Sequence, residues 1–405
     1  MSSNLETSYS ITSVQAMFKT KFGTFMGNSS NFSNVTLSQL AKNSLLNAKE
    51  YKFPLRVGHG GNTGSGRLPE ATVPLYKDIT LTPKKHYARL IVDRLALQGS
   101  LTSEDAFASF SKEPLEVTAL AFNGMQSRQI FGNDESGSGA LGTVLSVSGV
   151  GPYDVVMTTA TWKEANFEEN SLVNFGTSLD NFKINSVTPS TRTINVTRQA
   201  AGVTVPTAAD IVYNQGSKDA EMVGLGVLTK TSGTVYGATI DRKFSGTFID
   251  LADVESITPD RLNQLALRIE KKCGMAPNIA PFSYEQYEVI LNQMEDQKRY
   301  QQSQISPVSS LAKGKISFPG IQFLSSGGPI NIFPERFVEP AGGYMGHNEK
   351  WELYRTPGTG WMTDDNTTFL RVMDEDKYEA RYGMYSELFV NLPFWGKIGR
   401  AQFLA

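Results

Sequence analysis

A glycine-rich stretch comes nearest, by residue type and spacing, to a known chemical motif. In Gly61–Arg67, which follows Gly60, two glycines bracket four residues, and a P-loop of that spacing cradles a triphosphate with its backbone N–H groups. A P-loop also needs a lysine on the phosphates, a hydroxyl on the metal and a helix that begins beside the anion. Here Arg67 stands where the lysine should be and Leu68 where the hydroxyl should be, and nearby prolines make a helix unfavourable.

The same stretch is better interpreted as a flexible turn between two extended segments. Glycine tolerates a positive φ, and the Asn, Thr and Ser side chains among the glycines bond to their own backbone. An enzyme that binds a nucleotide through Gly61 to Arg67 remains the less favoured alternative. A nucleotide-binding measurement distinguishes the two.

The other residue types that carry out catalysis do not cluster in the sequence. The histidines, His59, His86 and His347, are tens of residues apart and lack cysteines or paired carboxylates at metal-binding spacing. The single cysteine, Cys273, fits an inert position in a helix. No Gly-x-Ser-x-Gly elbow stands between a strand and a helix. We therefore expect no enzyme, no metal site and no cofactor.

Two further groups of residues are expected to have structural roles. The acidic run Asp374–Asp376 offers too few oxygen ligands for a hard cation and is expected to be a solvated turn. Trp351, Trp361 and Trp395 could stack on bases, but they lack interleaved basic residues, so packing in a core or an interface is favoured.

Composition indicates a folded protein with more than one part. The chain has 405 residues, of which 40% are hydrophobic and 19% charged. That length favours about two or three domains. The net charge of −2 provides no positive field that would draw a nucleic acid to the protein. No run of 18 apolar residues occurs, and the first residues lack a signal peptide, so neither membrane spanning nor secretion is expected.

Hydrophobic periodicity predicts the following order of elements. Residues 1–50 form an arm with two short helices, the second carrying Leu37, Leu40, Ala41 and Leu45 on one face. Residues 51–97 form a long hairpin whose prolines exclude it from the centre of a sheet. A helix of about 18 residues, or about 27 Å, begins near Pro114 and ends at Gly132.

The second half of the chain is predicted to be β-rich, with two helices in its middle. In residues 139–235, apolar and polar residues alternate in short runs that are separated by clusters of turn residues. One helix is capped by Thr258 and ends at Gly274, and the next starts at Ser283, which has capping-box spacing to Gln286. A polar loop follows over residues 301–315, and the last 60 residues return to strand patterns.

This order, and three segments in particular, resemble the major capsid proteins of tailed bacteriophages, which have the Hong Kong 97-type fold. The segments are "NTTFLRVMDEDKYEARYGMYSELFVNLPFWGKIGRA" for the last long strand, "SKEPLEVTALAFNGMQSRQIFG" for the spine helix and "IVYNQGSKDAEMVGLGVLTKTSGTVYGATIDR" for the end of a β-rich insert. The resemblance covers essentially the whole chain.

The resemblance implies an α+β capsid fold with named parts. These are an N-terminal arm (1–50), an extended E-loop hairpin (51–97), a P-domain with the spine helix (98–138), a β-rich inserted domain (139–235), an A-domain (236–345) and C-terminal strands that complete the P- and A-domains (346–405).

The implied function is structural. The chain would self-assemble into pentamers and hexamers of an icosahedral capsid around packaged double-stranded DNA, in the host cytoplasm, and would remain in the virion. Its implied partners are other copies of itself, a portal and a separate scaffolding protein, because only about 50 residues precede the hairpin. A decoration protein is a further candidate, DNA would be a weak, non-specific neighbour, and no membrane is involved. An encapsulin-like cellular shell is the alternative within the same fold.

The resemblance also implies two contact regions. The hairpin tip would lie over a neighbouring subunit, and the polar loop would lie near the five-fold and six-fold axes. The sequence identifies neither a partner Asn nor a catalytic Glu for a covalent cross-link from the hairpin lysine. The implied contact residues are Gly58, Gly61, Gly64, Gly66, Arg67, Glu70 and Lys77 in the hairpin, and Gln301, Ser309, Ser310 and Lys313 in the loop.

Overall fold

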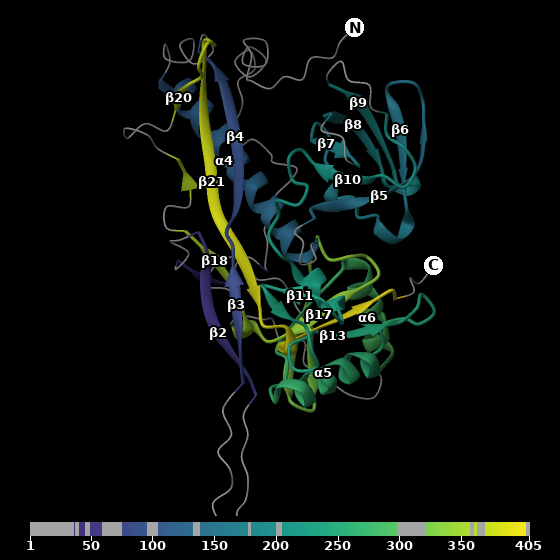
Figure 1. Ribbon diagram of the computed structural model, residues 1–405. Coiled ribbons are helices and arrows are strands. Elements are labelled where there is room, and N and C mark those ends of the chain that lie inside the picture. The colour runs from purple at the N-terminus through teal and green to yellow at the C-terminus, as the bar shows by residue number, and fades with distance from the viewer. Residues whose placement is uncertain are drawn as a thin grey trace, which may run out of the picture.

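The structure, a computed structural model, describes residues 36, 40–44, 49–58, 75–94, 104–132, 138–176, 180–199, 205–297, 321–356, 360–362 and 369–401. A long column of strands backed by one helix stands beside two rounded lobes, of which one is a β-barrel and the other carries two helices (Figure 1). The amphipathic helix predicted before residue 30 lies outside the described residues.

The column is built around one long strand. Strand β21 (Lys377–Val390) pairs antiparallel with β4 (Lys84–Asp93) over its first ten residues and with β18 (Trp351–Arg355) over its last five. Its Tyr, Phe and Val residues suit a pleated, packed surface. The same sheet is completed by β1 (Ala41–Asn43), β19 (Gly360–Trp361) and β20 (Leu370–Arg371).

The column's helix is longer than the sequence analysis predicts. Helix α4 spans Glu104–Gly132, 29 residues, so Pro114 lies inside it and does not mark its first turn. Glu, Ala and Lys residues before the proline favour helix, although an interior proline costs about 3 kcal/mol. The predicted end at Gly132 is confirmed.

The first lobe is a closed six-stranded barrel with its own apolar core. The β-rich character predicted for this region is confirmed, but the barrel ends at Asn214 and not near residue 235. The apolar residues from Met222 to Leu228 join the main core instead. The barrel strands are β5 (Ala140–Ser148), β6 (Tyr153–Met157), β7 (Leu172–Phe175), β8 (Phe182–Thr188), β9 (Thr193–Arg198) and β10 (Ile211–Asn214).

The second lobe packs helices α5 (Pro259–Cys273) and α6 (Tyr284–Gln297) on a six-stranded sheet. Both predicted caps are confirmed: Thr258 Oγ1 accepts from Arg261 N at 3.3 Å, and Ser283 Oγ accepts from Gln286 N at 3.2 Å. Gly274 ends α5 with φ +77°, a conformation that favours glycine. The sheet strands, in spatial order, are β13 (Thr247–Asp250), β22 (Trp395–Gly399), β17 (Gly343–Gly346), β14 (Ile279–Phe282), β16 (Gly328–Pro334) and β15 (Ile321–Ser325).

The predicted hairpin is divided between two sheets. Strands β2 (Tyr51–Gly58) and β3 (Leu75–Leu81) form a two-stranded sheet of their own, in which Pro54 lies opposite Asp78. After Pro83 the chain leaves this sheet, and β4 joins the column. Another small pair, β11 (Thr234–Val235) and β12 (Ala238–Thr239), lies beside β3.

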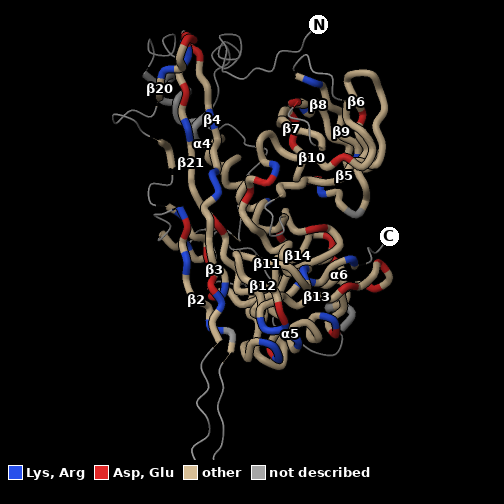
Figure 2. Tube along the Cα trace, viewed as in Figure 1, with Lys and Arg blue, Asp and Glu red and all other residues tan. Residues whose placement is uncertain are grey.

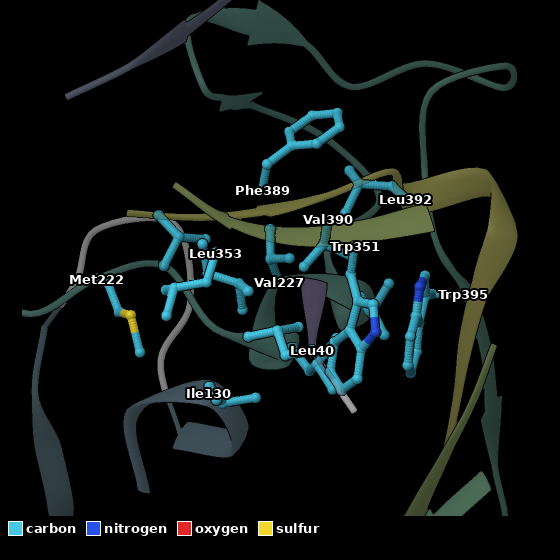
Figure 3. Close-up of a cluster of buried hydrophobic side chains, with 14 of the residues drawn as sticks. Leu40, Ile130, Met222, Val227, Trp351, Leu353, Phe389, Val390, Leu392 and Trp395 are labelled. Atoms are coloured by element: carbon cyan, nitrogen blue, oxygen red, sulfur yellow. The ribbon is translucent and has the colours of Figure 1, made fainter. Parts of the chain in front are cut away.

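A large apolar core joins the column, the hairpin and the second lobe (Figure 3). At its centre Trp351 and Trp395 are fully buried, with ring centroids 4.4 Å apart, which confirms that these tryptophans pack inside the protein. Leu40 is buried in the same cluster. The helix predicted around it is confirmed only up to Leu40: Thr36 is helical and Leu40 N donates to Thr36 O at 3.0 Å, but Ala41–Asn43 form a strand parallel to β18. Strand pairing and burial of Leu40 override the helical pattern there.

We expect Trp351→Ala to lower the free energy of unfolding by about 3 to 5 kcal/mol, because it leaves a large cavity in the main core. Trp361→Ala is the matched control, since Trp361 is only half-buried and contacts Tyr382 at the edge of the column. Denaturant unfolding of the unassembled protein measures both. Equal losses for the two variants would contradict this assignment of the core.

Candidate functional site

The stem of the β2–β3 hairpin is packed firmly on its own subunit. Phe53 packs edge-on against Phe389 with ring centroids 5.0 Å apart, and the ring centroids of Tyr51 and Tyr354 are 5.5 Å apart. On the partner strand Ile79 is fully buried. Thr80 N also donates to Tyr236 O at 2.8 Å. The stem is therefore an integral part of the body.

Lys77 fastens the stem to the loop after β12. Its Nζ lies 2.7 Å from Asp241 Oδ2, donates to the backbone oxygen of Thr239 and sits 5.5 Å from the centroid of the Phe244 ring. The hydrogen bond from Lys77 lowers the pKa of Asp241, assisted by the backbone N–H groups of Lys243 and Phe244. Lys77 and Asp241 thus interact as a charged pair.

Beyond this anchor the hairpin becomes exposed. Leu75 and Tyr76 are 58% and 53% exposed, although both are large and partly apolar. Gly58 lies opposite Leu75, and a Cβ on it would lie 3.0 Å from Lys243 Nζ. Leu75 and Tyr76 are successive residues of β3, so their side chains point to opposite faces of the hairpin.

Buried ionisable side chains meet where helix α4, β21 and the segment after the barrel converge. Arg128 donates to Glu221, and their side chains are 6% and 2% exposed. Two residues later Val223 N donates to Glu387 Oε1 at 2.7 Å. Burial raises the pKa of Glu387 to about 8 and lowers the pKa of His86, on β4, to about 4. Both side chains are neutral near pH 7 in the folded protein.

Within the described ranges no cluster of three or more His, Cys, Asp or Glu side chains could hold a metal ion. Cys273 ends α5, and burial raises the pKa of its thiol, which fits the inert role predicted for it. Among the described helices none is both long and apolar enough to cross a membrane.

Comparison with solved structures identifies the fold. The capsid of cyanophage A-1(L) matches with a TM-score of 0.57 at 12% identity, over 95% of this chain and 98% of that chain. The chain has the Hong Kong 97-type capsid fold. The resemblance to tailed-phage major capsid proteins is thereby confirmed at the level of the fold.

Two further structures score lower and add no argument. The encapsulin SrpI from Synechococcus elongatus gives a TM-score of 0.49 at 10% identity, with 97% of each chain covered. The capsid of an empty GTA particle gives 0.47 at 9% identity, with 96% of each chain covered. No protein-family profile matches the sequence, and no curated protein matches it significantly.

Most of the predicted contact residues fall in parts of the chain outside the described residues. Of the hairpin set, Gly58 and Lys77 are described, and Lys77 contacts Asp241, Thr239 and Phe244 of its own subunit. Its contact to a neighbour stays a prediction. The turn charges at Asp374–Asp376 are exposed, as expected. The remaining predicted residues, outside the described ranges, are Gly61, Gly64, Gly66, Arg67, Glu70, Gln301, Ser309, Ser310 and Lys313.

The sequence gives little sign of these buried ionisable side chains. In the sequence His86 suggests only a metal ligand, and Arg128, Glu221 and Glu387 belong to no motif. Glu387 stands in the apolar run "SELFVNL", and a carboxylate in such a run is the one signal that could have marked it.

We expect Glu387→Gln to become more stable relative to the parent protein as the pH rises. The folded pKa of Glu387 lies near 8, above its ordinary value of 4.5, so its contribution is complete below pH 4.5 and is lost as the pH rises towards 8. Glutamine keeps an oxygen for Val223 N and does not titrate. Melting temperatures of both proteins between pH 5 and 8 measure the difference.

The difference in melting temperature, variant minus parent, removes the effect of the groups that both proteins share. His86 also titrates, with a depressed folded pKa that removes stability as the pH falls from 6.5 to 4, but it is common to both. A constant difference across the pH range would show that Glu387 is charged throughout in the folded protein.

Proposed function

We propose that this chain is a major capsid protein that assembles into pentamers and hexamers of an icosahedral shell around double-stranded DNA. The observation that carries the proposal is the end-to-end match to the cyanophage capsid, in which each chain covers at least 95% of the other. A match to one part of the chain would leave room for an enzyme built on a shared domain, whereas this match extends over 95% of the chain.

The hairpin geometry supports contact between different surfaces of neighbouring subunits. Lys77 and the aromatic stem hold one end of the hairpin, and Leu75 and Tyr76 expose the other end. A contact that joins two unlike surfaces repeats around an axis and closes a ring. In the proposed shell the loop between β2 and β3 lies on the next subunit, and Gln301, Ser309, Ser310 and Lys313 lie near the ring axis.

Electron microscopy and sedimentation of the expressed protein test the proposal. We expect closed particles, with a separate scaffolding protein co-expressed if the chain alone does not close. A chain that stays monomeric under both conditions would refute it. Particles that form in infected cells should contain DNA and a portal, and particles that enclose protein cargo without either would favour the encapsulin-like alternative.

We expect the β2–β3 loop to be needed for particles and dispensable for the subunit. Gly58 and Leu75 are paired neighbours, so residues 59–74 can be replaced by a two-residue Asn-Gly turn that closes the stem. The melting temperature of the unassembled protein should stay within about 2 °C, because the stem contacts remain, while the yield of particles falls at least about tenfold.

A matched control separates the sequence of this loop from its length. In the control a Gly/Ser segment of equal length replaces residues 59–74. If the loop binds through its own side chains, the control also loses particles. Normal particle yield from the Asn-Gly variant would show that the loop does not join subunits.

A further inference from the structure

The outward face of the β4–β21 strand pair carries an ordered group of charged and aromatic side chains. Successive residues of a strand point to opposite faces of its sheet. Tyr382 contacts Phe122 of α4, with ring centroids 4.9 Å apart, so even-numbered residues of this part of β21 face the helix. Arg381, and Arg89 opposite it on β4, therefore point away from the helix.

Two arginines share one buried carboxylate on this face. Arg89 Nε lies 2.5 Å from Glu379 Oε2, and Arg381 donates to the other oxygen, Glu379 Oε1. Glu379 is 4% exposed, whereas the arginine side chains are 53% and 50% exposed. Although burial opposes its ionisation, these two ion pairs lower the pKa of Glu379 overall. The carboxylate is thus charged and holds both guanidinium groups in place, with a net charge of +1 and further N–H donors facing outward.

Tyrosines and a lysine continue the same face. Tyr87 and Tyr385 hydroxyls are 3.0 Å apart, and Tyr87 is 48% exposed. Gly383, opposite Tyr87, leaves room for two neighbours, since a Cβ there would clash with Met362 Cε and lie 3.1 Å from a Tyr87 ring carbon. Lys85 is exposed beside them, opposite Tyr385. Figure 2 shows blue segments on both strands of this pair.

We propose that this face, with Arg89, Arg381, Lys85 and Tyr87 as its contact residues, binds the phosphates of a single-stranded nucleic acid. Guanidinium groups match phosphate oxygens with paired N–H donors. An exposed tyrosine ring next to them gives a base a surface to stack on, a contact that a carboxylate group does not make. The observations therefore favour nucleic acid over a carboxylate-rich protein segment.

The inference goes beyond the proposed function, because it assigns residues to a contact with single-stranded nucleic acid and not to the enclosed double-stranded DNA. The net charge of the whole chain is −2, so the binding should be weak and confined to this face. The inference is tested on unassembled protein. A negative result would therefore not count against shell formation, and a protein that fails to assemble can still be tested for binding.

Fluorescence anisotropy with a labelled single strand of about 16 nucleotides tests the proposal. We expect a dissociation constant of about 10 to 100 μM at low salt and a slope of log K against log salt near −2.1 for contacts from Arg89, Arg381 and Lys85. Arg381→Gln should weaken binding about fivefold to tenfold and bring the slope to about −1.4.

Arg94→Gln is the matched control. Arg94 follows β4 on the same column, is 40% exposed and pairs with Asp376 at 3.3 Å, so this variant removes one positive charge of the same kind. The dissociation constant of this variant for the single strand should stay within about twofold of that of the parent protein, because Arg94 is not among the proposed contact residues. An equal loss in both variants, or an unchanged slope for Arg381→Gln, would overturn the proposal.

Two further measurements keep the test decisive if Arg381→Gln does not fold. Tyr87→Leu leaves the Arg89–Glu379–Arg381 group intact. It should weaken the binding of the single strand and leave the binding of inorganic tripolyphosphate unchanged. Competition with poly-glutamate should fail to displace the strand. Displacement by poly-glutamate as effective as that by unlabelled DNA would show instead that the face recognises an acidic protein segment.

Discussion

Backbone pairing along β21 is the constraint on which the rest of the molecule depends. Its first residues pair with β4 and its last with β18, and after a short turn the chain enters β22 in the sheet of the second lobe. One continuous stretch of chain therefore holds the column and the helical lobe in a single body. Tyr236 reinforces the junction by donating its hydroxyl to Leu388 O at 2.8 Å. A change that shifted the register of β21 would displace both parts together.

Local sequence signals were reliable where local chemistry determines the structure. Thr258, Ser283 and Gly274 act within one turn of a helix, so their effect is visible in a short window. Signals failed where distant partners decide. Leu40 has helical spacing with its neighbours, yet β18, some 300 residues later, draws the next residues into a strand. The end of the barrel could not be predicted either, because nothing in the apolar run from Met222 to Leu228 indicates whether it packs in the barrel core or in the main core.

The candidate site follows the same division. The sequence predicted a hairpin at the right place, since strands and turn residues are local features. It could not show that Lys77 forms an ion pair with Asp241, 164 residues later in the chain. Nor could it show that Arg128, which precedes the barrel in the sequence, forms an ion pair with Glu221, which follows it. A buried ion pair contributes little net stability, but loss of one partner is costly because it leaves the other charge buried and unpaired. Such a pair determines how the segment after the barrel attaches to α4.

The closed barrel has a consequence for how this protein could diverge. Its first and last strands, β5 and β10, pair with each other, with Tyr213 opposite Ala140, so the chain enters and leaves at neighbouring points. All six strands have two neighbours, and the barrel has a separate core. A module joined in this way can be exchanged, enlarged or lost in evolution while the host column keeps its sheet and its main core. It also presents no unpaired strand edge, which matters for a protein that would be packed in many copies side by side.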